Sequence, residues 1–257
     1  MNKSILNTGV QDFINNYKNA DILSVALKKS PFASVSSREL AEQITSRKKC
    51  EKKLPTWFKT SGIFYPGSLA VEQASSEQTA QYKASLVSGK TLIDLSGGMG
   101  VDSYYFSQQI DQLTCCEINP SLAEITAHNF QVLGANNIDV KHGDGMLFLH
   151  ENKKTYDWIY VDPARRGKQK QRVFRLEDGK PDVIEHLQLL LDRAGKILLK
   201  TAPMLDIQQG LRDLQNASQI HVVSVRNEVK DLLWVLDKSQ DKEPCLLYTS
   251  DAADDSK

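Results

Sequence analysis

Apolar positions along this chain follow two different spacings. In the first sixty residues they recur at helical spacing, as at Val10, Phe13, Ile14 and Tyr17, and predict helices. Farther on, short apolar runs bounded by turn residues predict strands instead. These runs lie at 91–94, 113–116, 138–141, 158–161, 196–200, 219–226 and 232–236. Stretches long enough for helices separate the strands, so the pattern predicts an α/β domain over residues 61–240 behind a helical region at 1–60.

Two helices are predicted from more specific signals. The sequence Ser36-Ser37-Arg38-Glu39 is a capped start for a helix that runs to Lys52, and Leu54-Pro55 ends it. A second helix is expected over Leu69–Leu86, leading into the sheet. It carries six polar side chains that either contact a ligand at the mouth of the domain or form a solvated face: Glu72, Gln73, Glu77, Thr79, Tyr82 and Lys83.

The first predicted strand ends in a glycine-rich turn. Asp94-Leu95-Ser96 is followed by Gly97, Gly98 and Gly100, and an amphipathic stretch begins near Val101. Glycine allows positive φ and close approach of a ligand to the main chain, and the following helix directs free N–H groups at the turn. A nucleotide-like cofactor fits such a turn, although a glycine turn can also only connect a strand to a helix.

The next three strands also end in acids. Glu117 follows the second strand and is placed to accept hydrogen bonds from ribose hydroxyls. Asp144, after the third strand, is expected beside an adenine, and Asp162 follows the fourth strand. Each acid alone could be a helix N-cap. Four acids in register at one sheet edge, where open α/β sheets bind ligands, favour a binding site.

These residues resemble the motifs of class I S-adenosylmethionine-dependent methyltransferases, with Ser96 in place of the usual first glycine. The resemblance covers roughly residues 63–238 and implies a Rossmann-like sheet of seven strands whose last strand is antiparallel. It implies a catalytic role for Asp162 and Pro163. It assigns cofactor binding to Asp94, Ser96, Gly97, Gly98, Gly100, Glu117, Ile118, Asp144 and Gly145.

Six short motifs carry a narrower resemblance: Tyr65-Pro66, Glu72-Gln73, Ser75–Glu77, Asp94–Gly98, Asp162–Arg166 and Pro203–Asp206. This resemblance is to a bacterial methyltransferase family. Its longer members continue into a THUMP-like domain associated with RNA binding. NAD is the competing cofactor, because Gly98–Ser103 fits G-x-G-x-x-S. Two features argue against NAD. Dinucleotide-binding proteins rarely have an acid such as Asp94 at the end of the first strand, and the Asp162-Pro163 turn has no standard role in hydride transfer.

The turn after the fourth strand suggests the acceptor. The Asp162 carboxylate and the Pro163 carbonyl could accept hydrogen bonds from an exocyclic amine and aim its lone pair. Residues 162–167 also resemble the Asp-Pro-Pro-Arg-x-Gly of uridine C5 methyltransferases. Those enzymes need a cysteine after strand five, where this chain has Lys200-Thr201-Ala202-Pro203, so covalent catalysis is not expected. Arg165, Arg166 and Lys200 are predicted to bind the substrate.

Composition limits the partners. Lys+Arg and Asp+Glu number 32 each, so no overall charge attracts nucleic acid. Basic runs at 47–53 and 165–172 are local. Four cysteines form neither a disulfide framework nor a metal spacing. With no leader and no apolar stretch of membrane-spanning length, we expect a cytoplasmic protein without a membrane partner. The oligomeric state is not predicted.

The end of the chain has an unusual origin. Residues 245–254 match the translation of a DNA string that resembles a transposon-end adapter used in sequencing libraries. We therefore expect the natural sequence to break off near Pro244 and a C-terminal domain to be missing; the alternative is an ordinary polar tail. Cys245 carries no functional expectation.

Together these features predict an S-adenosylmethionine-dependent methyltransferase acting on an RNA base. Two alternatives stay open: a noncatalytic RNA-binding module that keeps the cofactor fold, and a methyltransferase acting on a protein or a small molecule.

Overall fold

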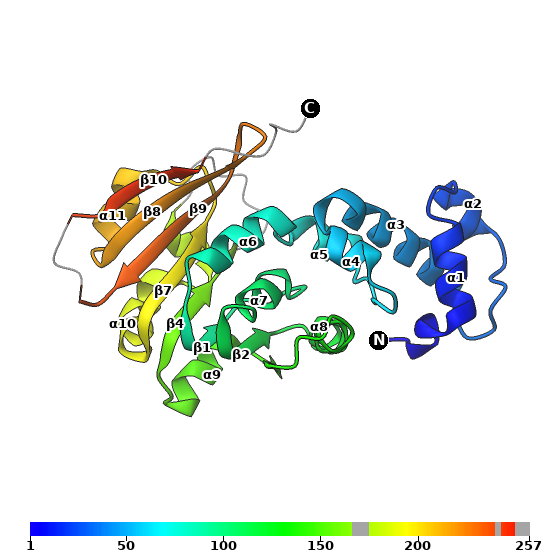
Figure 1. Cartoon of the computed structure of the whole chain (residues 1–257), viewed down its shortest axis with the longest axis horizontal. Helices are drawn as coiled ribbons and strands as arrows, with labels where there is room; N and C mark the ends of the chain where they lie inside the picture. The colour runs from blue at the N-terminus through cyan, green and yellow to red at the C-terminus, as the bar shows by residue number, and fades with distance from the viewer. Residues whose placement is uncertain (166–174, 240–242, 250–257) are drawn as a thin grey trace.

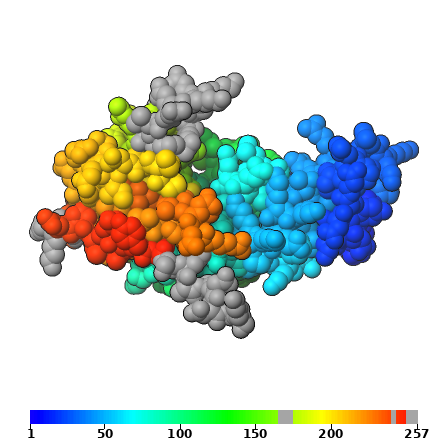
Figure 2. All heavy atoms as spheres, turned by 90° about the horizontal axis from the view of Figure 1, so that it is seen from above, coloured from blue at the N-terminus to red at the C-terminus, as the bar shows by residue number. Residues whose placement is uncertain are grey.

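The computed structural model describes residues 1–165, 175–239 and 243–249. One large mixed sheet flanked by helices occupies one end of the molecule, and the N-terminal helices occupy the other (Figure 1). In the space-filling view the blue N-terminal helices project from one end, and the cyan segment around residue 75 lies between them and the sheet (Figure 2). No helix within the described ranges is long and apolar enough to cross a membrane.

The sheet has the strand order β10-β8-β9-β7-β4-β1-β2-β3. All neighbouring strands are parallel except at β9, which is antiparallel to both β7 and β8. The bounds are β1 Gly89–Asp94, β2 Ile110–Glu117, β3 Ile138–His142, β4 Tyr156–Val161, β7 Ala194–Thr201, β8 Ala217–Val225, β9 Glu228–Asp237 and β10 Cys245–Thr249. The seven predicted strands are confirmed, and so is the antiparallel direction of the last of them, β9.

The eighth strand, β10, was not expected. It pairs in parallel with the edge strand β8, and its residues are largely exposed. The pairing uses main-chain groups at an open sheet edge, which any extended segment possesses. It therefore adds a strand to the sheet without testing the expectation about the origin of residues 245–254.

Two layers of helices cover the sheet, because successive side chains of a strand point to opposite faces. Leu92 of β1 and Cys115 of β2 face one core, whereas Ile93 and Cys116 face the other. The first core is covered by α6 Glu77–Ser85, α7 Val101–Phe106 and α8 Pro120–Val132. The second is covered by α9 Gly145–Asn152, α10 Val183–Arg193 and α11 Ile207–Asp213.

The N-terminal helices form a core of their own around Ile14, Leu40 and Ile44, which also includes Phe64 and Ile125 of α8. Their bounds are η1 Lys3–Leu6, α1 Thr8–Asn16, α2 Ile22–Leu27, α3 Ser37–Lys53, α4 Pro55–Lys59 and α5 Ser68–Gln73. The predicted capping box at Ser36 and Glu39 is present. Because Ile125 belongs to the sheet domain, this core joins the helical region to it.

The single helix predicted over 69–86 is wrong. The structure has two helices, α5 and α6, separated at Ala74–Ser76. The Ser76 hydroxyl accepts a hydrogen bond from the Thr79 amide and starts α6 as its N-cap. The break turns the chain at the mouth of the sheet, where the site lies.

After β4, a short two-stranded ribbon joins β5 Ala164–Arg165 to β6 Gly179–Lys180, next to the short helix η2 Leu176–Asp178. This ribbon stands beside the carboxyl edge of the sheet.

Candidate active site

A cleft of about 1950 Å³ opens at the carboxyl ends of β1, β2, β4 and β7. Small-ligand pockets usually measure roughly 300–1,000 Å³, so this cleft has room for two reactants. Its walls include residues 95–102, 116–119, 143–146, 162–164 and 200–203, the segment 66–75 before α6, and the region 175–186.

The glycine turn forms the floor of the cleft and could not be built from other residues. Gly100 has φ +79°, and a Cβ there would lie 2.5 Å from Cζ of Phe130. A Cβ on Gly97 would lie 2.5 Å from the Cys115 sulfur. The main chain is therefore held against α8 and β2 beneath it and is bare of side chains at these positions, as a main-chain cradle for a ligand requires.

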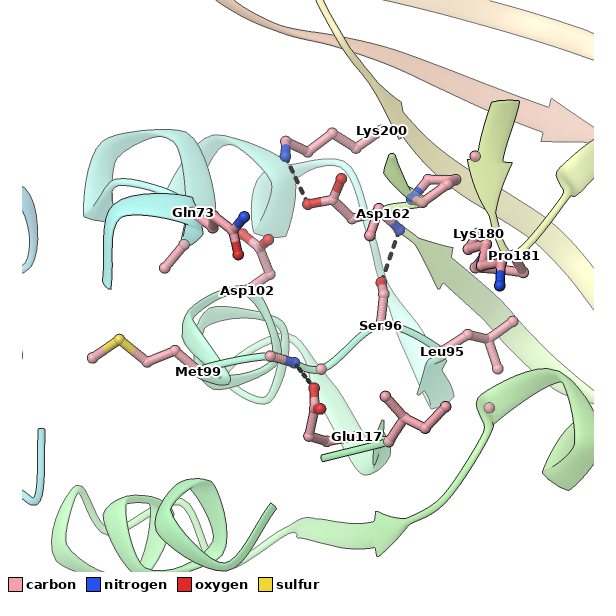
Figure 3. Close-up of a pocket in the computed structure, with 18 of the residues that line it drawn as sticks. Gln73, Leu95, Ser96, Met99, Asp102, Glu117, Asp162, Lys180, Pro181 and Lys200 are labelled. Atoms are coloured by element: carbon pink, nitrogen blue, oxygen red, sulfur yellow. Dashed lines mark hydrogen bonds and ion pairs between the residues drawn. The ribbon is translucent and has the colours of Figure 1, made fainter. Parts of the chain in front are cut away.

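Ser96, the departure from the usual motif, links two loops. Its hydroxyl accepts a 2.8 Å hydrogen bond from the Asp162 amide and donates to Oδ1 of Asp94 at 3.2 Å. The loop after β4 is thereby tied to the glycine turn after β1 (Figure 3).

Asp94 lies beneath the turn and does not line the cleft. Its carboxylate accepts hydrogen bonds from the Ser96 amide at 2.9 Å and the Ser103 hydroxyl at 2.6 Å. The side chain is fully buried, and burial raises its pKa to about 7. The structure thus places this predicted cofactor residue where it shapes the turn from below.

Glu117 lies at the cleft, at the end of β2. Its Oε2 accepts a 2.7 Å hydrogen bond from the Gly98 amide (Figure 3). Its Oε1 accepts one from the Asn119 amide at the same distance. Each carboxylate oxygen can accept a second hydrogen bond, so the fixed carboxylate can still receive two hydroxyls. Ile118 beside it is two-thirds exposed and lines the cleft.

Asp144 and Gly145 form the next part of the wall. Oδ1 of Asp144 caps α9 by accepting from the Met146 and Leu147 amides. A Cβ on Gly145 would lie 2.7 Å from the Leu95 carbonyl oxygen, so glycine allows the two loops to touch. Both residues line the cleft with Glu117, as the register of strand ends predicted.

Asp162 and Pro163 lie on the opposite wall. Lys200 Nζ is 2.6 Å from Oδ2 of Asp162 (Figure 3). The same Nζ is 3.8 Å from Oδ1 of Asp231. Pro163 packs against the ribbon, where a Cβ on Gly179 would lie 2.8 Å from the Pro163 Cβ. All three predicted residues, Asp162, Pro163 and Lys200, line the cleft.

The sequence did not predict that three further charged residues would meet here: Asp102 and Asp231, which line this wall, and Lys83, which is buried behind it. Lys83 is fully buried on α6, and its Nζ lies 2.7 Å from Oδ1 of Asp102. One signal was available, because Lys83 occupies an apolar position of its helix between Ala80 and Ala84, which are both buried. A lysine at such a position needs a buried partner, but the sequence does not name it.

The basic residues are less informative than the sequence suggested. Arg166 lies outside the described residues, and of Arg165 only the backbone, in β5, is described. Farther along the chain, Arg175 pairs with Glu177 at 3.4 Å. In the run 47–53, Lys49 pairs with Glu72, and Lys53 donates to the carbonyls of Val71 and Glu72. Part of that run thus stabilises the end of α5.

The strand order, the glycine turn and the acids at the strand ends define a class I methyltransferase domain. The profile of the family described as RNA cap guanine-N2 methyltransferase matches residues 89–232, more than half of the chain, and the chain belongs to this family.

Individual relatives agree with this assignment. A crystal structure from Porphyromonas gingivalis W83, of a protein proposed to be a methyltransferase, superposes with a TM-score of 0.82 at 31% identity and covers 94% of this chain and 60% of that one. An uncharacterized RNA methyltransferase of Mycoplasma mobile is 26% identical over 155 residues, which are 58% of this chain and 42% of the relative. The tRNA (guanine(26)-N(2))-dimethyltransferase of Methanosphaera stadtmanae is 27% identical over 86 residues, or 32% of this chain and 22% of the relative. The chain therefore spans less than half the length of either curated relative.

S-adenosylmethionine is the cofactor of this class, and the cleft fits it. A Cβ at Gly97 or Gly100 would collide with the atoms beneath the turn, so only glycine lets the main chain form this cradle. The fixed carboxylate of Glu117, with Ile118 and Asp144 beside it, matches the donors and the flat ring of an adenosine. Among the described residues no group of histidine, cysteine and carboxylate side chains could hold a metal ion.

Proposed function

We propose that this chain transfers the methyl group of S-adenosylmethionine to an exocyclic amine of an RNA base, with N2 of guanine as the first acceptor to test. The family description and the names of the two curated relatives support RNA and guanine N2. When bound, the cofactor supplies an electrophilic methyl carbon on a sulfonium. The glycine turn, Glu117, Ile118, Asp144 and Gly145 would hold it, and the buried Asp94 would support the turn from below.

The observation that carries the proposal is the placement of Asp162. Its amide is bonded to Ser96 of the cofactor turn, and its Oδ2 is engaged by Lys200. Among the described residues, Oδ1 of Asp162 has no hydrogen-bond partner, so it can accept a hydrogen bond from an amine, with the Pro163 carbonyl as a second acceptor. Such bonds orient the nitrogen lone pair, and positioning of this kind can account for much of the rate of a displacement.

Covalent catalysis on a pyrimidine is not supported. The segment Lys200-Thr201-Ala202-Pro203 on the cleft wall contains no thiol. Cys116 lies at the edge of the cleft, but burial raises its pKa to about 12, so little thiolate forms at neutral pH.

The test measures transfer of labelled methyl groups to the separated RNA, protein and small-molecule fractions of cells that lack the gene, followed by mass spectrometry of the nucleosides. The proposal expects label in RNA, as N2-methylguanosine or N2,N2-dimethylguanosine. Label in protein or small molecules instead would favour the second alternative. Tight RNA binding with no transfer to any fraction would favour the noncatalytic module.

RNA binding is part of the same proposal. Arg165 and Arg166 follow the Asp162-Pro163 turn and are expected to pair with phosphates. Arg165→Ala and Arg166→Ala should therefore weaken RNA binding and lower its salt dependence. Longer relatives are expected to add affinity through a C-terminal THUMP-like domain. A full-length relative should then methylate the same RNA with a lower KM than this chain.

A further inference from the structure

The cleft wall that carries Asp162 is called the acceptor wall below. Five charged side chains at or behind this wall form one connected group, the acid–lysine cluster: Lys83, Asp102, Asp162, Lys200 and Asp231. Lys200 Nζ is 2.6 Å from Asp162 Oδ2 and 3.8 Å from Asp231 Oδ1. Lys83 Nζ is 2.7 Å from Asp102 Oδ1 and 3.8 Å from Asp231 Oδ2. Asp231 thus stands between the two lysines, and five separate elements of the fold contribute to the cluster.

Lys200 is already committed to protein carboxylates. Its side chain is 17% exposed. Burial alone lowers the pKa of a lysine, but the carboxylates of Asp162 and Asp231 more than offset this and raise the pKa of Lys200 above its usual value. Three carboxylates surround two ammonium groups in the cluster, so the fully ionised cluster carries one negative charge. An RNA phosphate would meet a compensated lysine inside a negative group, which disfavours its binding there.

We propose that Lys200 is a positioning residue that fixes the carboxylate of Asp162 for the acceptor, and that Asp231 holds Lys200 in place from the neighbouring strand. This inference rests on the proposed function, in which Asp162 orients the acceptor amine. A lysine side chain has many rotamers, so a single carboxylate partner would leave its ammonium mobile. The second carboxylate, on β9 next to β7, restricts the ammonium and through it Oδ2 of Asp162.

The kinetic test compares Lys200→Met and Asp231→Asn with the parent, using the RNA that the parent methylates. Misplacing a reacting group by about 1 Å can cost roughly 100-fold in rate. We expect kcat to fall about 10- to 100-fold in Lys200→Met and several-fold in Asp231→Asn, with KM for RNA within about twofold and an unchanged salt dependence of RNA binding. A rise in KM with a reduced salt dependence in Lys200→Met would instead assign Lys200 to phosphate binding and overturn the proposal.

The chain offers a matched control. Lys196 and Asp237 are directly paired on the same two strands, with Nζ and Oδ2 3.9 Å apart, and neither lines the cleft. Lys196→Met and Asp237→Asn should leave kcat unchanged. If these variants lower kcat as much as the cluster variants do, the effect belongs to the β7–β9 ladder and not to Asp162.

Removal of Lys200 alone leaves buried carboxylates unbalanced, so the variant could fail to fold. Lys200→Met/Asp231→Asn removes one charge of each sign and keeps the net charge of the cluster. Crystal structures of the single Lys200→Met variant and of this double variant with S-adenosylhomocysteine give a readout that needs no RNA. In both, the Asp162 carboxylate should leave the position that it has in the parent. An unmoved carboxylate overturns the inference, whereas the absence of any RNA acceptor for the parent overturns only the proposed function.

Discussion

The two walls of the cleft are built in different ways. The cofactor wall consists of main-chain turns after β1, β2 and β3, shaped by glycines and by carboxylates that accept amide hydrogen bonds, as Glu117 does from Gly98. The acceptor wall consists of charged side chains that reach the cleft from α7, the loop after β4, β7 and β9, with the buried Lys83 of α6 behind them. The first wall depends on local sequence, and the second depends on tertiary contacts between distant segments.

This difference has a physical consequence. A turn without side chains can recognise a ligand only by shape and hydrogen bonds, and it tolerates little change in the chain. A cluster of paired charges can be altered by single substitutions. The cofactor wall is therefore expected to be general to the class, and the acceptor wall to determine the substrate.

The largest effect is expected at the acceptor wall. Asp162→Ala should lower methyl transfer by about 100- to 10,000-fold, because the acceptor loses its orienting carboxylate. Cofactor affinity should stay within a few fold, since Asp162 joins the cofactor turn through its amide, which the variant keeps. Transfer assays and calorimetry with S-adenosylmethionine measure the two quantities. Unchanged transfer would remove Asp162 from the catalytic assignment.

The cofactor wall should be most sensitive at its glycines. Gly100→Ala is expected to destabilise the fold by about 2–4 kcal/mol, through the clash with Phe130 and Thr126 and the strain of positive φ. Gly134→Ala is the matched control, since Gly134 has φ +76° and an added Cβ meets nothing within 4 Å. Denaturant unfolding of the two variants separates strain from clash. Equal losses would show that packing beneath the turn contributes nothing.

A smaller effect is expected at Glu117. Glu117→Ala removes the acceptor of the Gly98 and Asn119 amides together with the proposed ribose contact, and it should weaken S-adenosylmethionine binding by about 1.5–3 kcal/mol. Titration calorimetry measures the loss. Tight NAD binding by the parent without S-adenosylmethionine binding would contradict the assignment of the cofactor.

The same division explains what the sequence could predict. The strands, the glycine turn and the acids at 117, 144 and 162 follow from local patterns of spacing and turn chemistry, and the structure places them at one edge. The acid–lysine cluster joins residues up to 148 positions apart, from Lys83 to Asp231, and no local pattern encodes such a pairing. Asp94 was expected at the ligand, but the bonds that hold it under the turn involve Ser103, in the first turn of α7.

Asp94 and Asp102 allow the comparison to be tested by pH. Both are buried carboxyl groups, but the described residues that donate hydrogen bonds to Asp94 are neutral serines, whereas Asp102 also lies 2.7 Å from Lys83. Burial raises the pKa of Asp94 to about 7 from 3.8. Burial also opposes ionisation of Asp102, but Lys83 outweighs it, and the pKa of Asp102 is lowered.

The signs of the two contributions are opposite. Between pH 4 and 7 the folded state holds more protons at Asp94 than the unfolded state, so the stability contributed by Asp94 falls as pH rises, by at most about 1.4 kcal/mol per pH unit. Asp102 contributes stability above its unfolded pKa that is lost as pH falls through the folded value.

Unfolding of the parent, Asp94→Asn and Asp102→Asn in urea at several pH values measures both slopes. Compared with the parent, the free energy of unfolding of Asp94→Asn should rise more steeply, or fall less, between pH 4 and 7. Asp102→Asn should remove part of the loss of stability below pH 4. If Asp94→Asn leaves the slope unchanged, the carboxyl under the turn is ionised in the folded protein, and the two walls do not differ in how they hold charge.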